Sequence, residues 1–365
     1  MSKSVKRSDR VFLIYLLILI VFGFTVLTSA SAPMGYERFH DIYYFVKRQF
    51  LFGLLPGLAV FLVVARLPYT FIKTMAWPFY LLALAGLVAV FIPGIGLAIN
   101  GSRSWISVGL FNFQPAELAK LAIIIIMAGL LAQPERDLND WQNGLLPVLA
   151  VVSPAVLLIL LQPDIGTLSI LIVIIFALLF LSRVPSKFLL AMAMVGGVAF
   201  MAILVAAPYR VQRLTVFLHP ELDPLGVGYH VNQAFLAVGS GGFWGLGFGQ
   251  SRQKFQYLPE VNADSIFAII AEELGFVVAA GLIILILLIT KRGLRIAKEA
   301  PDEFGRLLVG GIMVWFFWQS FLNIGAMVGA MPLTGVPLLF ISHGGSAMLT
   351  GLMAMGIVAA VSRAE

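Results

Sequence analysis

The sequence has no cysteine and few charged residues, and these two shortages exclude several classes of protein. Without cysteine there is no disulfide framework, no thiolate nucleophile and no cysteine-ligated zinc or iron–sulfur centre. The four histidines are scattered through the 365 residues and lack the close spacing of a histidine metal site. Charged residues make up 12% of the chain, which is about half of the share usual in soluble proteins.

Hydrophobic residues, in contrast, make up 60% of the chain. A soluble fold of this size could not cover so much apolar material with polar surface, which excludes a soluble enzyme and a disordered protein. The net charge of +6 does not indicate nucleic-acid binding, because the basic residues occur in short groups between apolar runs. This distribution is typical of membrane topology signals.

The apolar runs predict an all-α, polytopic membrane protein, because each is close to the length of a spanning helix and none alternates as a barrel strand would. About ten such helices are expected. They lie near residues 11–32, 45–65, 74–93, 114–132, 144–161, 165–182, 188–207, 265–289, 307–329 and 344–362.

The distribution of Lys and Arg predicts the orientation of these spans. With the N-terminus inside, fifteen of the 24 basic residues lie in inside segments and eight in outside segments. Both termini are therefore expected in the cytoplasm. Residues 1–365 form a single membrane domain in this interpretation, and residues 208–264 form a long extracytoplasmic loop between helices 7 and 8, of a length that usually carries function.

Ionisable residues inside apolar runs are the informative ones in a membrane protein. Glu117 and Lys120 are three residues apart, so they share one helix face and can form an ion pair, either as a structural pair or as part of a polar cavity. Asp164 either caps the helix that follows it or contacts a substrate or cation. At least one of Glu272 and Glu273 must face a polar interior.

The predicted outer loop contains a glycine-rich stretch at 239–249, which is followed by Arg252 and Lys254. Such backbone approaches ligands closely, and the two cations can bind phosphate; alternatively the stretch is a flexible loop that is attracted to anionic lipid. Asp264 lies where this loop re-enters the membrane, and it is either a helix cap or a general base.

The segment 335–346 contains Pro337 and paired glycines at the start of the last span, which indicates irregular backbone buried in protein or lining a cavity. Ser342, His343 and Ser346 could hydrogen-bond this backbone or bind a ligand. A single histidine here does not define a catalytic triad.

Taken in order, these motifs resemble the SEDS family (shape, elongation, division and sporulation), which includes FtsW, RodA and SpoVE. The resemblance covers almost the whole chain. The matching segments are 44–49, 100–107, 114–120, 162–164, 239–242, 257–260, 269–275 and 342–346. Residues 250–260 are more similar to FtsW and SpoVE than to RodA.

The resemblance implies a peptidoglycan glycosyltransferase that polymerises lipid II at the outer face of the bacterial cytoplasmic membrane, for division or elongation. It implies a class B penicillin-binding protein as partner and contacts with membrane lipids. Asp264 matches the family's essential aspartate and is the expected catalytic base, although its preceding residues Asn262-Ala263 replace the family's His-Thr, and His343 replaces a tyrosine.

A divalent cation, Mg²⁺ or Mn²⁺, is expected to neutralise the diphosphate of the lipid. The predicted substrate-binding and diphosphate-binding residues are Arg48, Arg103, Arg210, Arg213, Arg252, Lys254, Glu260, Ser342, His343 and Ser346. Two other functions remain open from the sequence: a lipid II flippase and a scaffold of the division machinery. A transporter usually places its charges near the bilayer midplane, whereas here they gather at the predicted outer edge.

Overall fold

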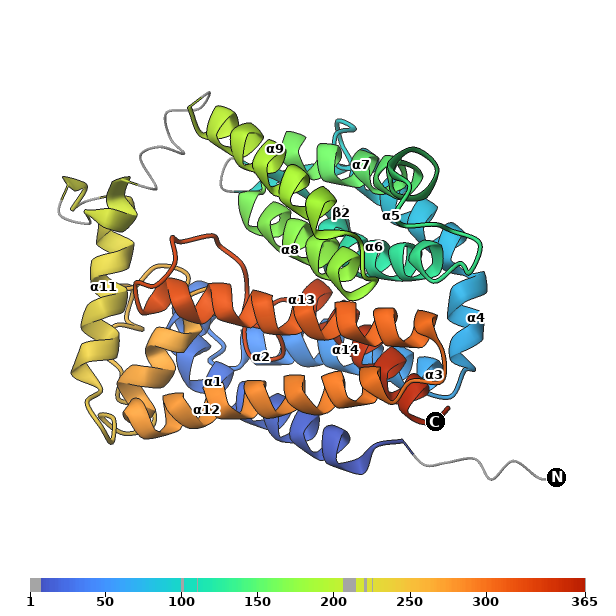
Figure 1. Cartoon of the computed structure of the whole chain (residues 1–365). Coiled ribbons are helices and arrows are strands. Elements are labelled where there is room, and N and C mark those ends of the chain that lie inside the picture. Colours follow the sequence, from blue (N-terminus) through green and yellow to red (C-terminus); the bar gives the residue numbers. More distant parts are fainter. Residues whose placement is uncertain are drawn as a thin grey trace.

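The structure is a computed structural model, and it describes residues 8–99, 102–109, 111–205, 215–219, 222–224 and 226–364. It is built mainly of helices that run side by side, with one small sheet (Figure 1). The helices are α1 (Arg10–Phe39), α2 (Tyr44–Gln49), η1 (Phe50–Leu54), α3 (Leu55–Val64), α4 (Tyr69–Thr74), α5 (Ala76–Ala89), α6 (Pro115–Leu131), η2 (Trp141–Leu145), α7 (Leu146–Leu161), α8 (Ile165–Leu181), α9 (Ser186–Val205), α11 (Val227–Ser240), α12 (Ile266–Lys298), α13 (Glu303–Met327) and α14 (Gly345–Ser362).

Each of the ten predicted spans coincides with a helix or a run of consecutive helices. By length and composition, six of these are able to cross a membrane: α1, α2 to α3, η2 to α7, α12, α13 and α14. Shorter apolar helices lie at Ala76–Ala89, Ile165–Leu181 and Ser186–Val198. The polytopic helical fold is confirmed, and ten as the number of crossings stays a prediction.

Helices α6, α13 and α14 form the centre of the molecule. In α6, 15 of 17 residues are buried. In the most apolar 18-residue stretch of each helix, 83% of the residues are buried in α14, against 33% in α1 and α12. The outer helices direct large apolar side chains such as Leu17 and Leu287 away from the protein, as a helix does where lipid takes the place of water.

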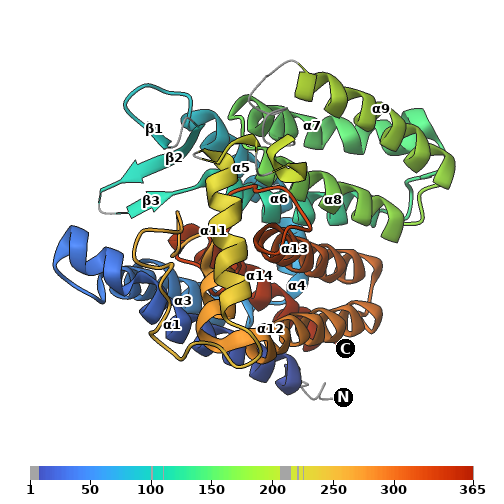
Figure 2. The same cartoon turned by 90° about the vertical axis from the view of Figure 1, so that its left-hand side faces the viewer.

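Two features of the fold were not predicted. A three-stranded antiparallel sheet, β1 (Gly96–Ile99), β2 (Ser102–Val108) and β3 (Phe111–Phe113), follows α5. Helix α11 lies across the ends of α12 and α13, within the segment expected to be a loop (Figure 2). Its buried side chains Val231, Ala234 and Ala237 recur at helical spacing and face the bundle. We call this end of the bundle the α11 end.

The ends of the described chain meet at the opposite end of the bundle. The backbone amide of Asp9 donates to Ser362 Oγ, and the Asp9 carboxylate pairs with Arg292 at 2.6 Å. Helix α12 continues to Lys298, beyond the predicted limit at 289. Its last turns are amphipathic, and Arg292 in them pairs with Asp9. This contact places both ends of the described chain on one side, as an even number of spans requires.

Candidate active site

Helix α12 is interrupted at Gly275, and the glycine-rich stretch binds at the break. Gly275 has φ 75° and ψ −179°, and a Cβ there would lie 2.3 Å from the backbone nitrogen of Gly245, so only glycine fits. The break releases two carbonyl groups from the helix. Glu272 O accepts from Leu246 N at 2.9 Å, and Glu273 O accepts from Gly247 N at 3.0 Å.

Lys254 is buried in this region and does not face a ligand. Its ammonium pairs with Glu273 Oε1 at 2.8 Å and donates to Ser29 Oγ at 3.0 Å and to Gly249 O at 2.7 Å. These contacts use the three donors of the ammonium group. The prediction of Lys254 as a diphosphate ligand is therefore not supported, because the burial of Glu273 in α12 requires a cation beside it.

Glu272 holds the same loop by other contacts. Ser251 Oγ donates to Glu272 Oε2, and the Arg252 amide donates to Glu272 Oε1 at 2.9 Å. Both glutamates thus face a polar interior, as predicted for at least one of them. Arg252 is exposed.

Asp264 lies in a shallow hollow at the α11 end, two residues before α12 begins. The hollow is lined by Asp264, Asn323, Ala326, Met327 and the segment 333–336. The N-cap of α12 is Ser265, not Asp264. Asp264 is partly exposed, and Ser265 Oγ donates to its Oδ1 at 3.4 Å.

Three hydrogen bonds from separate parts of the fold fix the segment that carries Asp264. Asn323 Nδ2, on α13, donates to Asp264 O at 2.8 Å. The amide of His343, just before α14, donates to Asn262 O at 2.7 Å. His230 Nε2, on α11, lies 2.6 Å from Ser265 Oγ. Asn323 and His230 were not predicted, because neither lies in a motif with a recognisable spacing.

His230 is expected to make the protein sensitive to mild acid. Burial lowers the pKa of His230 from 6.5 to about 4. In the unfolded chain, the His230 ring therefore becomes protonated as the pH falls below 6.5. In the folded protein, the same ring stays neutral until the pH falls to about 4. The stabilisation is complete above pH 6.5 and falls by about 3 kcal/mol as the pH drops to about 4.

Thermal unfolding in detergent, compared at about pH 7.5 and about pH 5, measures this effect. The unfolding temperature should fall more in the natural protein than in His230→Gln. An equal fall in both proteins would show that another group is responsible.

His343 is held among aromatic and polar groups near this segment. Its ring lies edge-on to Phe45, with ring centroids 5.2 Å apart. Burial and the positive charge of Arg48 lower the pKa of His343 to about 4, so the ring is neutral at pH 7. Gln49 spans the backbone beside it, donating to Ser342 O at 3.2 Å and accepting from Gly344 N at 2.9 Å.

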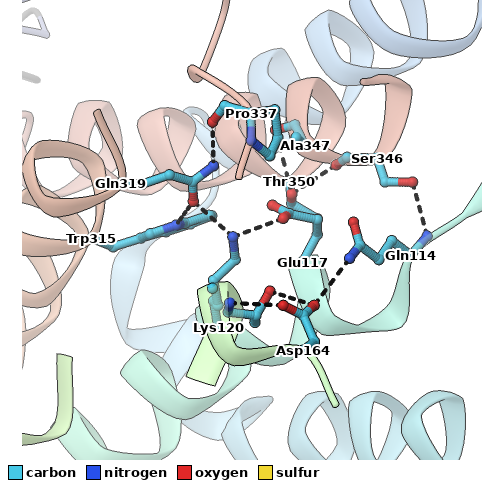
Figure 3. Close-up of polar contacts among 12 residues, drawn as sticks. Gln114, Glu117, Lys120, Asp164, Trp315, Gln319, Pro337, Ser346, Ala347 and Thr350 are labelled. Carbon is cyan, nitrogen blue, oxygen red and sulfur yellow. Dashed lines mark hydrogen bonds and ion pairs between the residues drawn. The ribbon is translucent and has the colours of Figure 1, made fainter. Parts of the chain in front are cut away.

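The predicted pair of Glu117 and Lys120 lies in the centre of the bundle (Figure 3). The two charged groups are 2.8 Å apart and buried. Lys120 Nζ also donates to Gln319 Oε1 at 2.7 Å, and this oxygen accepts from Trp315 Nε1 at 2.7 Å. Glu117 Oε2 has no hydrogen-bond partner among the described residues. The ion pair therefore faces protein, as predicted.

Ser346 and Asp164 take structural roles on either side of Gln114 (Figure 3). Ser346 Oγ accepts from the Gln114 amide at 3.0 Å, and Gln114 Nε2 approaches Asp164 Oδ2 at 3.5 Å. Asp164 caps α8 by accepting from Thr167 N at 2.9 Å. Ser342 Oγ accepts from Leu338 N at 2.8 Å and so closes a turn.

The remaining predicted ligands differ in exposure. Arg103 on β2 and Glu260 are exposed, and Arg48 is half-buried beside Tyr44 and Phe52. Arg210 and Arg213 lie outside the described residues. Within the described ranges, no group of three acidic or histidine side chains could hold a metal ion.

Together, the apolar helices, the buried ion pair and the partly exposed Asp264 at the α11 end define a multi-pass membrane protein with a polar site at one end of its bundle. The chain matches, over residues 9–365, the model of a family described as cell cycle proteins and named for FtsW, RodA and SpoVE. It belongs to this FtsW/RodA/SpoVE family.

Individual relatives agree with this assignment. The chain is 39% identical to stage V sporulation protein E of Bacillus subtilis, covering 100% of this chain and 99% of that one. It is 34% identical to a probable peptidoglycan glycosyltransferase FtsW of a Geobacter species, covering 99% and 98% of the two chains. The predicted similarity to FtsW and SpoVE is thus confirmed.

Two solved structures share the fold. A chain of a peptidoglycan synthase complex, described as coordinating polymerization and crosslinking, superposes with a TM-score of 0.80 at 27% identity, over 98% of both chains. The rod shape determining protein RodA of Thermus thermophilus superposes with a TM-score of 0.72 at 27% identity, over 98% of this chain and 97% of that one.

Proposed function

We propose that this protein is a peptidoglycan glycosyltransferase that polymerises lipid II into glycan strands at the outer face of the cytoplasmic membrane. The observation that carries the proposal is the partly exposed Asp264 in a segment that is fixed by contacts from α11, α13 and the segment before α14. Relatives named as peptidoglycan glycosyltransferases align with almost the whole chain and support it.

In the proposed reaction, Asp264 takes the proton from the 4-hydroxyl of the acceptor N-acetylglucosamine. The oxygen then attacks C1 of the donor N-acetylmuramic acid, and the C1–oxygen bond to the lipid diphosphate breaks with inversion. The sugar passes through an oxocarbenium-like state, as in glycoside hydrolysis. Arg48, Arg103 and Arg252 are the described cations that could stabilise the leaving diphosphate.

A divalent cation in this mechanism would arrive with the diphosphate. The described residues offer no site of three acidic or histidine ligands, so a cation held by protein alone does not fit. Mg²⁺ commonly binds phosphate oxygens together with one or two carboxylates, and the exposed Glu260 on the same turn as Asp264 suits this arrangement. Such a cation would offset the charge of the leaving group.

The proposal includes a partner and an orientation. A similar structure is a peptidoglycan synthase complex, which supports a class B penicillin-binding protein as the transpeptidase partner. The basic residues between the spans support an orientation with both termini in the cytoplasm. The α11 end and Asp264 then lie outside, where lipid II is polymerised.

The test is polymerisation of labelled lipid II by the purified protein together with its transpeptidase, resolved by strand length. We expect long glycan strands in the presence of Mg²⁺ or Mn²⁺ and a large loss on chelation, restored by either ion. The absence of strands with the partner and cation present would refute the proposal. Full activity in the presence of a chelator would refute the role of the cation and would leave the proposed polymerase activity standing.

A further inference from the structure

Asn323 on α13 is buried beneath Asp264 and binds two segments at once. It is 2% exposed. Its Nδ2 donates to Asp264 O at 2.8 Å and to Val336 O, also at 2.8 Å. One amide group therefore joins the start of α12 to the segment before α14.

The orientation of this amide follows from its partners. Both partners are carbonyl oxygens, which only accept hydrogen bonds, so the NH₂ side of Asn323 must face them. Its Oδ1 consequently points away, and it has no hydrogen-bond partner among the described residues. A buried amide oxygen without a partner is unfavourable, and a leucine, which has the same branching and number of side-chain heavy atoms, would avoid that cost. A role in packing alone does not explain an asparagine here.

The segment that Asn323 holds forms a wall beside the Asp264 carboxylate. Gly335 adopts φ 70°, and a Cβ built on it would lie 3.9 Å from Asp264 Oδ2. One turn earlier on α13, Gln319 Nε2 donates to Pro337 O at 2.9 Å (Figure 3). Two residues one turn apart on α13 thus hold this part of the chain: Asn323 bonds Val336 within the wall, and Gln319 bonds Pro337 just after it. Asn323 also bonds Asp264 O.

We propose that Asn323 is a positioning residue that fixes the separation between Asp264 and the wall segment 333–336, so that the carboxylate faces the acceptor hydroxyl. This inference rests on the function proposed above. A displacement of the base by about 1 Å can lower the rate of the chemical step by about 100-fold. The contacts of Asn323 act on the backbone of Asp264, so its loss should affect turnover more than substrate binding.

The experiment compares three variants in complex with the transpeptidase, measuring kcat and KM for lipid II and thermal unfolding. Asn323→Leu removes both hydrogen bonds and keeps the branching and number of side-chain heavy atoms, and Asn323→Gln keeps the donor at a longer reach. Ser320→Ala is the control, because Ser320 is equally buried on α13 but bonds only to Phe316 O of its own helix.

We expect kcat to fall about 10- to 100-fold in Asn323→Leu, with KM within about twofold of the natural value. Asn323→Gln should retain more activity than Asn323→Leu, and Ser320→Ala should match the natural protein. A role in packing alone predicts the reverse order of activity, because glutamine buries an amide group that leucine does not have.

Natural turnover in Asn323→Leu, or greater activity in Asn323→Leu than in Asn323→Gln, would overturn the inference. If Asn323→Leu does not fold, kcat of Asn323→Gln decides, and a natural value there overturns it as well. Inactivity of the natural protein under the same conditions would count against the proposed function instead.

Discussion

Replacing Asp264 by Asn should abolish glycan polymerisation while leaving the protein folded. Asparagine has nearly the same shape but cannot take a proton from the acceptor hydroxyl. General base catalysis contributes about 10²- to 10⁴-fold to the rate of such a step, and a loss of this size is expected. The measurement is the yield of glycan strands from labelled lipid II, and Asp264→Ala should give the same result.

The control for this variant is Asp41→Asn, which removes a carboxylate that does not line the hollow. Asp41 lies between α1 and α2 and pairs with Lys47, whose side chain is 61% exposed. Its variant should polymerise normally. Thermal unfolding should distinguish loss of catalysis from loss of folding. The hydrogen bond from Asn323 is to the backbone oxygen of residue 264, which Asp264→Asn and Asp264→Ala both keep. Full activity of Asp264→Asn would disprove the role as base.

Among the substitutions proposed for this protein, Lys120→Met should cause the largest loss of stability. The substitution leaves the Glu117 carboxylate buried without its cation, and Glu117 Oε2 already has no partner among the described residues. Breaking a buried ion pair on one side typically costs about 3–5 kcal/mol. It also removes the donor to Gln319 Oε1. The measurement is the unfolding temperature in detergent.

A second substitution tests this explanation. Glu117→Gln combined with Lys120→Met removes the unpaired charge and should recover part of the lost stability. Lys47→Met, which breaks an exposed ion pair, should cause no measurable change. A double variant less stable than Lys120→Met alone would show that the unpaired charge is not the cause.

The hydropathy of the chain was sufficient to predict its long apolar helices, because each spanning helix needs a long apolar run. The pairing of Glu117 with Lys120 was also predictable, since both residues lie on one face of one helix. Helix α11 was not predicted, because its sequence is only partly apolar and its register depends on packing against α12 and α13. The small sheet contains strands of three to seven residues, which carry little periodicity.

In the site as well, residues marked by their local sequence were predictable, and residues defined by contacts with distant parts of the chain were not. Asp264 was singled out by its place before an apolar run and by family resemblance. Lys254 was misjudged as a ligand, because its partner Glu273 became apparent only with the break at Gly275. Asn323 could not be identified, since it meets Asp264 across 59 residues of sequence and belongs to no motif.

The position of the buried ion pair within α6 has a consequence for how the protein is made. Charged residues are costly to insert into a bilayer, but Glu117 and Lys120 can neutralise each other as soon as α6 is helical. That helix can therefore enter the membrane long before Gln319 is synthesised, 199 residues later. Asn323 and the wall segment 333–336 follow Gln319 in the chain. During biogenesis the walls around Asp264 are thus completed only when the last two helices arrive.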